Sequence, residues 1–308
     1  MRVAHISDCY LPRTGGIELQ VRGLSQAQLA AGESPEIITA TPAARGKAQI
    51  PGETDEGVPI HRLALDLPAG LPISPYVGAR LRDLLLDTAD VVHVHGGLVS
   101  VFAWPALRTA VKAGLPAVVS VHSVWAGWSR AFAAADLVSN WRKWPVLWTA
   151  VSDVAAAPLR DALGGHGEVR VLHNGIDLAG WRPPATTNTD PDEIVIVSVA
   201  RLAVRKRGLA LIDILEQARA KIPASKKIRA VLIGDGPDRS RIERTLERRN
   251  MDWVDCVGWQ DHDQIRAHYE RASIYISPSR LESFGIAALE ARTYGLPVVA
   301  LEDSGTNE

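Results

Sequence analysis

The chain has few cysteines and no surplus of charge of either sign. Its two cysteines, Cys9 and Cys256, lie far apart and belong to no Cys-x-x-Cys pair or Cys/His cluster. Neither a disulfide framework nor a zinc site is therefore expected, and a reducing compartment suits the chain. Lysine and arginine number 34 against 35 aspartate and glutamate residues. Without a basic field over the whole chain, we expect no nucleic-acid partner.

Long apolar runs are also missing. The N-terminal sequence MRVAHISDCY contains a short strand-like run that Asp8 interrupts, which is not the apolar stretch of a secretory signal. No run reaches the roughly 18 apolar residues that span a bilayer. We therefore expect a cytoplasmic protein.

The composition that remains is that of an ordinary globular protein. Of the 308 residues, 46% are hydrophobic and 22% charged, which excludes disordered and collagen-like chains. The length exceeds the roughly 100–200 residues of a usual domain, so two domains are expected.

Short runs rich in valine, isoleucine and alanine alternate with stretches of helical period. In the first half they predict strands at Val3–Ser7, Glu36–Thr39, Val91–His95, Ala117–Val121, Leu147–Ser152 and Val169–Leu172, and helices at Glu18–Ala31, Tyr76–Thr88, Val99–Ala113 and Asp153–Leu163. In the second half they predict strands at Ile194–Val199, Arg229–Ile233, Val254–Val257, Ile274–Ser277 and Pro297–Leu301, and helices at Arg207–Ile222, Asp238–Arg249, Gln264–Arg271 and Phe284–Tyr294. Such alternation predicts an α/β fold with parallel sheets.

A change of composition separates the two halves. The segment Trp181–Glu193, WRPPATTNTDPDE, has three prolines and polar residues in place of the apolar period. It predicts a linker between a first domain over residues 1–180 and a second over 194–308. The last predicted strand lies just before Glu308, where an open α/β sheet would usually add another helix, so we expect the second domain to be incomplete.

Ligands of open α/β sheets bind beyond the carboxyl ends of the strands. After the first predicted strand, Gly15 and Gly16 precede a helix, where backbone amides and a helix N-terminus would favour an anion. His95 and His122 end two further strands on the same rim and could serve as proton or hydroxyl partners. Turn glycines and hydrogen-bonded structural histidines are the alternatives.

Cationic and glycine-rich segments follow the strands of the second half. Arg201 and Lys206 precede a helix and suit a diphosphate, with a solvated basic face as the alternative. Gly234 opens a Gly-Asp-Gly-Pro turn that could bring backbone against a ligand. Gly258 precedes Trp259, which could stack on a base, although a structural aromatic is favoured.

Two glutamates lie near the last predicted helix. Glu282 and Glu290 are eight positions apart, a rise of roughly 12 Å if the span were helical. Hydrolytic carboxylate pairs lie about 5–9.5 Å apart, so a direct acid and nucleophile pair is disfavoured. Separate contacts on one ligand fit better, with Glu282 on a sugar and Glu290 accepting hydrogen bonds from hydroxyls. A surface helix glutamate is the alternative for Glu290.

Taken in order, these segments resemble the retaining glycosyltransferases of family 4, also called group 1. The resemblance covers nearly the whole chain and rests on Gly15-Gly16, Asn174-Gly175-Ile176-Asp177, Arg201-Leu202 with Lys206, Gly234-Asp235-Gly236-Pro237, and the Glu282 and Glu290 pair. It implies the GT-B fold, in which two doubly wound Rossmann-like domains face each other across a cleft. It also implies transfer of a sugar from a nucleotide diphosphate, with no metal and no cofactor, and retention of anomeric configuration.

The resemblance assigns roles to the candidate residues. The donor diphosphate would be held by Arg201, Lys206 and the Gly15 and Gly16 amides, with Glu282 at the donor sugar, Glu290 near the ribose and His122 facing the transferred sugar. Further donor-binding positions are Gly234, Gly258, Ser283, Phe284 and Gly285. Family members usually continue past residue 308 with further helices, so Ser304-Gly305-Thr306-Asn307-Glu308, which resembles the final donor loop, is expected to fray at a free end.

The acceptor is expected to be a glycan, a lipid-linked molecule or a small molecule. Five tryptophans crowd one segment of the first half, at Trp125, Trp128, Trp141, Trp144 and Trp148, with Arg130, Arg142 and Lys143 between them. An interfacial helix at the inner face of a membrane is one interpretation. Packing in the core or an acceptor pocket is favoured, because Pro145 interrupts any long helix. A nucleotide-sugar epimerase, a two-domain solute-binding protein and a non-catalytic donor-binding protein remain as alternatives.

Overall fold

The computed structural model describes residues 1–308 except 14, 44–51, 65–77, 184–189 and 191. The chain divides into two compact units, Met1–Gly175 and Ile176–Glu308. Most of the predicted linker, and the first two residues of the helix expected at Tyr76–Thr88, lie outside the described residues.

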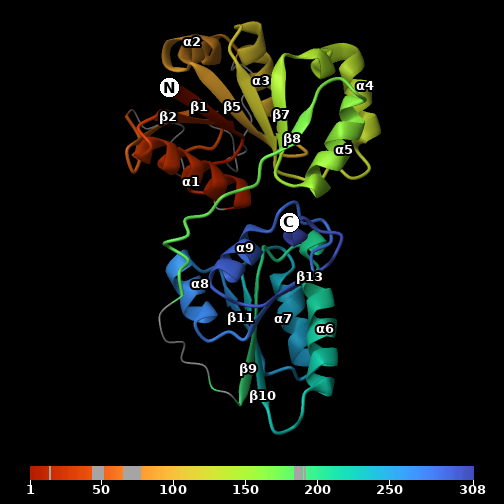
Figure 1. Ribbon diagram of the computed structural model, residues 1–308. Coiled ribbons are helices and arrows are strands. Elements are labelled where there is room, and N and C mark those ends of the chain that lie inside the picture. The colour runs from red at the N-terminus through yellow and green to blue at the C-terminus, as the bar shows by residue number, and fades with distance from the viewer. Residues whose placement is uncertain (14, 44–51, 65–77, 184–189, 191) are drawn as a thin grey trace. The chain divides into compact units, whose positions relative to one another are not determined.

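The first unit is built on an eight-stranded sheet in the order β3-β4-β2-β1-β5-β6-β7-β8. Its strands are β1 (Arg2–Ser7), β2 (Ser34–Thr39), β3 (Thr54–Asp55), β4 (Val58–Arg62), β5 (Val91–Gly96), β6 (Ala117–Val121), β7 (Val146–Ala150) and β8 (Val169–Val171). All neighbours pair in parallel except β3 and β4. The helices are α1 (Gly16–Ala30), α2 (Gly78–Thr88), α3 (Ala103–Lys112), α4 (Ser129–Ser139) and α5 (Asp153–Leu163), with a short 3₁₀ turn, η2 (Trp141–Lys143). Helix α2 packs against α3, and α4 packs against α5 (Figure 1).

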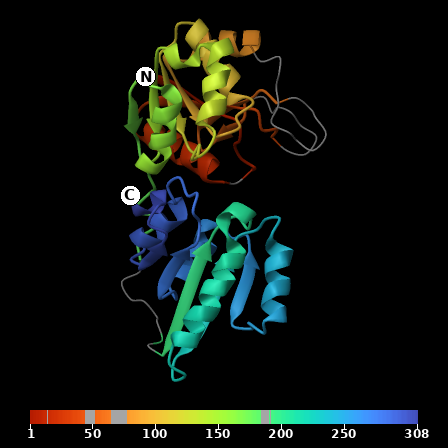
Figure 2. The ribbon, with the colours of Figure 1, turned by 90° about the vertical axis from the view of Figure 1, so that its right-hand side faces the viewer.

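The second unit contains a five-stranded parallel sheet in the order β11-β10-β9-β12-β13. Its strands are β9 (Glu193–Val199), β10 (Lys227–Ile233), β11 (Val254–Gly258), β12 (Ile274–Ser277) and β13 (Val298–Ala300). Its helices are α6 (Gly208–Lys221), α7 (Arg239–Arg248), α8 (His262–Tyr269) and α9 (Ile286–Thr293), with 3₁₀ turns η3 (Val204–Lys206) and η4 (Gly305–Asn307). Apolar residues of α6 and α7 pack on one face of the sheet and those of α8 and α9 on the other; α6 faces the viewer in Figure 2.

The predicted α/β alternation is confirmed in both units, with most element ends within two or three residues of the expected ones. The helix at Asp153–Leu163 is found with the expected bounds, because the Ser152 hydroxyl caps it by accepting from the Ala155 amide at 3.0 Å. The sequence did not predict β3, β4 or α4. In β4, Val58, Ile60 and Arg62 alternate as buried residues. The segment has only five residues and includes a proline, so its sequence does not predict a strand.

Two expectations about the second unit are wrong. Trp181, expected in the linker, is buried and packs against Tyr269 and the other core residues of this unit, because its indole is too large and apolar to stay in solvent. The terminal segment does not fray: Ser304 and Thr306 are 1% and 2% exposed, and the Gly305 amide donates to the Glu282 carbonyl at 2.9 Å.

The tryptophan-rich segment packs inward, as favoured. Trp125 stacks on Phe132 with ring centroids 3.9 Å apart, and Trp141 lies edge-on to Trp148. Trp125, Trp141 and Trp148 are buried, whereas Trp128 is half exposed. Among the helices within the described residues, none has the length and apolar character needed to cross a membrane.

Candidate functional site

The loops that follow β9, β10 and β11 are joined by backbone hydrogen bonds. The Ala200 amide donates to the Ile233 carbonyl at 3.0 Å, the Leu202 amide to the Asp235 carbonyl at 2.9 Å, and the Gly234 amide to the Gly258 carbonyl at 2.7 Å. These bonds bring the segments of Arg201, Gly234 and Gly258 together at the carboxyl ends of the strands, which the sequence order alone could not show.

Gly234 is required by this close approach. Its φ of +133° is one that L side chains rarely adopt, and a Cβ there would lie 2.0 Å from the Ala200 carbonyl oxygen. Gly236 meets Leu202 in the same way, at 2.3 Å. The two glycines of the Gly-Asp-Gly-Pro turn are therefore explained by packing alone, because they let the segment after β10 lie against the loop that carries Arg201.

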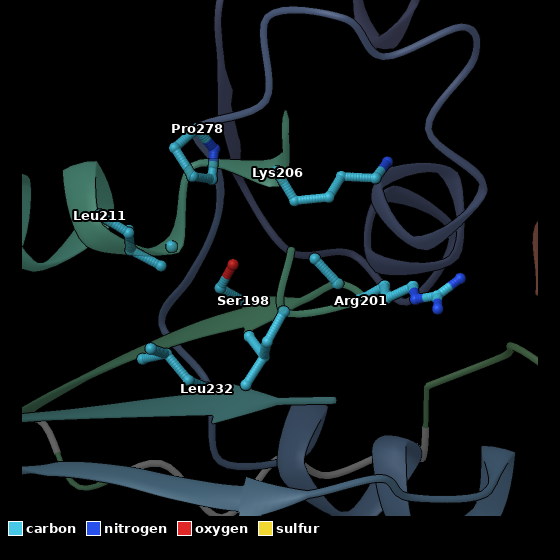
Figure 3. A pocket seen from close by; sticks show the side chains of 9 residues that line it. Ser198, Arg201, Lys206, Leu211, Leu232 and Pro278 are labelled. Carbon is cyan, nitrogen blue, oxygen red and sulfur yellow. The ribbon is translucent and has the colours of Figure 1, made fainter. Parts of the chain in front are cut away.

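Arg201 and Lys206 lie in the segment between β9 and α6. Both side chains extend past the end of the sheet in the same direction (Figure 3), Arg201 exposed and Lys206 partly buried. Beside them is a cavity of about 10 Å³, also lined by Ser198, Leu232 and Pro278. That volume holds about one water, so a diphosphate would meet these two cations at the open rim of the unit.

Lys206 is paired with Glu282, which lies in the segment between β12 and α9. Lys206 Nζ is 2.5 Å from Glu282 Oε2, and the two side chains are 20% and 15% exposed. Because both charged groups are mostly shielded from water, removing either one would leave the other as a buried charge without a partner, which lowers the stability of the fold. Lys206, expected at a phosphate, and Glu282, expected at a sugar, thus form one ion pair.

The loop before α9 is held by the terminal segment. Gly285 has a φ of +84°, and a Cβ there would come within 2.8 Å of Thr306 Oγ1. Arg292 donates to the Thr306 carbonyl. Phe284 is buried, and Ser283 is partly exposed. The N-cap of α9 is Gly285, which has no side chain to cap the helix.

Glu290 lies within α9 and is buried, so the alternative of a surface glutamate is wrong. Burial raises the pKa of its carboxyl to about 8. The imidazole Nε2 of His262 is 3.9 Å from Glu290 Oε1. Because α9 begins at Ile286, Glu282 and Glu290 do not share a helix, which agrees with separate contacts on one ligand.

A row of histidines runs across the sheet of the first unit. His5 Nδ1 is 3.0 Å from His95 Nε2, and His95 Nδ1 is 3.0 Å from His122 Nε2. The expected proximity of His95 and His122 is confirmed. His5 and its partner Gln28, 2.6 Å away, were missed, although His5 shares its strand register with His93.

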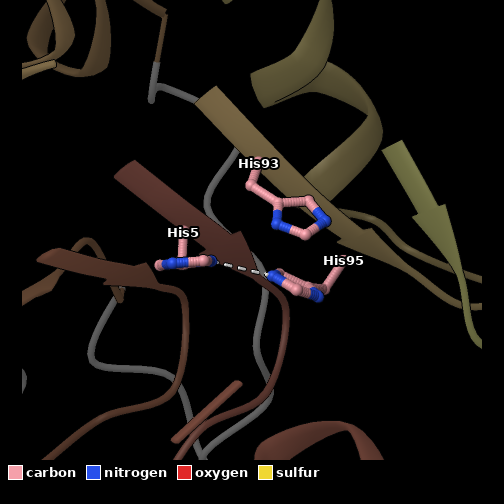
Figure 4. A group of neighbouring side chains, drawn as sticks. All are labelled: His5, His93 and His95. Atoms are coloured by element: carbon pink, nitrogen blue, oxygen red, sulfur yellow. Dashed lines mark hydrogen bonds between the residues drawn. The ribbon is translucent and has the colours of Figure 1, made fainter. Parts of the chain in front are cut away.

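Within the described residues, His5, His93 and His95 form a group of side chains that could ligate a metal ion, with one nitrogen of each within 4.8 Å of the others. The three rings converge from β1 and β5 (Figure 4). Two of the inner nitrogens, those of His5 and His95, already share one hydrogen bond. A cation at this position would have to displace that proton.

Gly15 and Gly16 form the start of α1 in the first unit. Gly15 is the N-cap, in extended conformation and without a side-chain capping bond. The Glu18 carboxylate turns back toward it, since a Cβ on Gly15 would lie 2.6 Å from Glu18 Oε2. An anionic ligand at this helix end would therefore meet a carboxylate, which the glycine pattern did not reveal.

Trp259 follows β11 directly after Gly258 and is 57% exposed. The favoured interpretation of a packed structural aromatic is wrong, because β11 ends at Gly258 and the indole lies outside the cores on both faces of the sheet.

Two families match the chain. Residues 14–179 match the family described as Glycosyltransferase Family 4, and residues 182–308 match the one described as Glycosyl transferases group 1. The gpi3 subunit of phosphatidylinositol N-acetylglucosaminyltransferase from Schizosaccharomyces pombe is 28% identical over 323 residues, which cover 98% of this chain and 66% of that protein. Glycogen synthase from Mycobacterium tuberculosis is 28% identical over 337 residues, covering 100% and 80%.

The fold is shared with a solved structure, Anabaena HepE in complex with UDP and glucose. The TM-score is 0.72 at 17% identity, and the match covers 100% of this chain and 82% of HepE. The expected fold of two Rossmann-like domains, GT-B, is thereby confirmed.

Proposed function

The chain belongs to the group 1, family 4 glycosyltransferases, and from this premise we propose that it is a retaining enzyme that uses a nucleoside-diphosphate sugar without a metal ion. The acceptor is a hydroxyl of a glycan, a lipid-linked molecule or a small molecule.

The observation that carries the proposal is the Lys206–Glu282 ion pair at the carboxyl ends of β9 and β12. Arg201 lies beside Lys206 (Figure 3). A diphosphate needs cationic partners, and its charge grows as the bond to the sugar breaks. Arg201 and Lys206 supply those charges. In this proposal Glu282, held against Lys206, contacts the sugar attached to the diphosphate.

The other residues of the second unit suit the remainder of the donor. Glu290, once ionised, can accept hydrogen bonds from two neighbouring ribose hydroxyls. The exposed face of Trp259 suits a nucleobase. The start of α9 and the segment Ser283-Phe284-Gly285 before it suit phosphate oxygens, because a helix N-terminus favours an anion.

The proposed reaction needs no protein nucleophile. The bond from the anomeric carbon to the diphosphate oxygen breaks, and the acceptor oxygen bonds to the same face of that carbon. The acceptor proton passes to the departing diphosphate. Orientation of the two substrates and stabilisation of the leaving charge then supply the catalysis, with His122 at the transferred sugar.

The nature of the acceptor is suggested by the relatives. One is named for transfer to phosphatidylinositol and the other for glycogen synthesis. A lipid-linked or a glycan acceptor is consistent with these names, and a lipid-linked acceptor would bring the protein to a membrane surface at the cytoplasmic side.

Turnover with anomeric analysis tests the proposal. The protein is incubated with UDP-, GDP- and ADP-sugars in EDTA, and hydrolysis or transfer is followed by proton NMR, which reports the configuration of the first-formed product. Retention of configuration without metal supports the proposal. Inversion, or a requirement for a divalent cation, contradicts it. For substitution of Lys206, the matched control is Lys226→Ala, since Lys226 pairs with Asp192 in an exposed ion pair elsewhere in the second unit.

A further inference from the structure

Helix α7 and the residue that follows it contain five arginines. Two of them are balanced by carboxylates of the second unit. Arg239 pairs with Glu243 at 2.8 Å, and Arg249 pairs with Asp213 of α6 at 2.7 Å. These two arginines therefore add little net charge to the surface of the unit.

The other three arginines, Arg241, Arg244 and Arg248, form a row that we call the arginine stripe. An α-helix turns by about 100° per residue, so the three lie within about 60° of one another around its axis. Ile242 and Leu246 lie on the opposite side of the helix and enter the core of the second unit. The stripe therefore faces away from the sheet, and each of its three residues is exposed.

No carboxylate balances the charge of the arginine stripe within the part of the chain that the structure describes. Its side chains form no ion pair there, although Arg248 donates to the Thr245 hydroxyl at 3.4 Å. Glu247 adjoins the stripe on the same surface and pairs with none of its members. Like charges three and four positions apart repel each other and lower the stability of a helix. Such a row favours a role in binding an anion, which would relieve the repulsion.

The chemistry and the shape of the stripe indicate the kind of anion. The planar guanidinium group of arginine pairs with phosphate oxygens through two hydrogen bonds at once. From Arg241 to Arg248 the helix rises by about 10.5 Å, which is longer than one phosphate group. Because the stripe lies on the outer face of a helix, a flat array of phosphates can meet all three arginines together.

Other macromolecular partners fit this surface less well. Protein interfaces have an apolar centre inside a polar rim, and the apolar residues of α7, Ile242 and Leu246, are turned into the core. The stripe also has no aromatic side chain on which a nucleic-acid base could stack, and the chain as a whole has a net charge of −1. A membrane that contains anionic phospholipids presents many phosphates in one plane.

We propose that the arginine stripe of α7 docks the protein onto a membrane surface that carries anionic phospholipids, through the phosphates of their headgroups. An interfacial helix inserts an apolar face into the bilayer, whereas the apolar face of α7 is covered by the sheet. Attachment is therefore electrostatic alone, and it weakens as salt screens the charges. Docking of this kind does not depend on the proposed transferase activity, although it would bring the protein to a lipid-linked acceptor.

Co-sedimentation with lipid vesicles tests the docking. The full chain is mixed with vesicles of phosphatidylcholine alone, or of equal parts phosphatidylcholine and phosphatidylglycerol, at ionic strengths of about 0.1 M and about 1 M. We expect binding to the vesicles that contain phosphatidylglycerol at the lower ionic strength, and release at the higher one. Equal binding to both kinds of vesicle, or binding that the higher ionic strength leaves unchanged, would overturn the proposal.

Substitution of the stripe locates the docking surface. The triple variant Arg241→Gln, Arg244→Gln and Arg248→Gln should lower the partition coefficient onto these vesicles by roughly 100-fold. Lysine at the same three positions keeps the charges and should retain most of the binding. The matched control removes the same net charge from three exposed arginines that form ion pairs elsewhere, by Arg160→Gln, Arg170→Gln and Arg229→Gln. It should bind vesicles nearly as the wild type does.

Wild-type binding by the folded glutamine variant, or an equal loss in the control variant, overturns the role of the stripe. Titrations with pyrophosphate and with single-stranded RNA separate the membrane from other sources of phosphate. Either ligand binding to the wild type and not to the glutamine variant, while vesicles fail to bind, would also overturn the proposal. Vesicle binding by a protein that turns over no sugar nucleotide would leave the docking intact and contradict only the proposed function.

Discussion

Lys206 Nζ lies 2.5 Å from Glu282 Oε2, although the residues are 76 positions apart in the chain. Each was expected at a different part of the donor, Lys206 at the diphosphate and Glu282 at the sugar. Their pairing means that a bound diphosphate would compete with Glu282 for the same ammonium group. The carboxylate and the cation are therefore coupled, and changing either one should alter the other.

Lys206→Ala should weaken binding of a nucleoside diphosphate by roughly 13- to 160-fold. It removes one charge-assisted contact, worth roughly 1.5–3 kcal/mol, and leaves Glu282 as an unpaired, mostly buried carboxylate near the phosphates. Calorimetric titration measures the effect. Lys226→Ala, which breaks an exposed pair, should bind like the wild type, and an equal loss in both variants would contradict the assignment.

Glu282→Gln should lower turnover much more than donor affinity. The amide would keep a hydrogen bond to the sugar of the proposed complex but would remove the negative charge that competes for Lys206, so nucleotide affinity should stay the same or rise. Steady-state kinetics and titration of the nucleoside diphosphate separate the two effects. Loss of affinity without loss of kcat would place Glu282 at the nucleotide and not at the sugar.

Nucleotide binding should release protons at pH 7. Burial raises the pKa of Glu290 to about 8, with His262 the ionisable neighbour at 3.9 Å, so most of the carboxyl is protonated before a ribose binds. Ribose hydroxyls favour the ionised form, which accepts from both. Calorimetry in phosphate and in Tris buffer reports the proton count. Glu290→Gln should abolish the release, and a wild type that exchanges no proton while binding would contradict this account.

The two units should respond to acid in opposite directions. Burial raises the pKa of Glu290 from 4.5 to about 8. The stability that this carboxyl gives to the folded state is therefore fully present below pH 4.5 and is lost as the pH rises through 8. The pKa of His5 and of His122 is lowered from 6.5 to about 4, so their contribution is present above pH 6.5 and is lost as the pH falls through 4.

Hydrogen exchange read by mass spectrometry at pH 7.5 and 5.5, corrected for intrinsic rates, resolves the two units. The first unit should lose protection in acid and the second should gain it. In Glu290→Gln the gain should disappear. Equal changes in both units would mean that these buried groups do not govern stability.

Gly234→Ala should destabilise the second unit by more than about 3 kcal/mol, because the added methyl group would clash with the Ala200 carbonyl oxygen at a backbone conformation that alanine avoids. Gly23→Ala is the matched control. Gly23 lies inside α1 with nothing within 4 Å of its Cβ position, so it should gain up to about 1 kcal/mol. Urea unfolding compares the two, and similar midpoints would contradict the packing argument.

The sequence predicted the alternation of elements well because the apolar period of each strand and helix is a local property. It also predicted that His95 and His122 lie on the same rim, since each ends a parallel strand, and the structure brings their rings within 3.0 Å of each other. The Lys206–Glu282 pair and the contact of His5 with Gln28 join segments that only the tertiary fold brings together, and no local pattern marks them.

Other errors came from residues whose surroundings decide their position. Trp181 lies in a proline-rich stretch that is typical of a linker, yet its indole enters the core of the second unit. The terminal segment was expected to fray, but Ser304 and Thr306 are buried against α9 and the loop before it. Glutamate is usually a surface residue, yet Glu290 is buried in α9. The helical period of the sequence alone does not show on which face of the helix it lies.

Calorimetric titration of the protein with UDP, GDP and ADP, each with and without magnesium, tests the central claim most directly. The account predicts that one of the three binds, that the affinity is the same with and without the metal, and that Lys206→Ala weakens it. Failure of all three to bind to folded protein, or binding that requires magnesium, would contradict it.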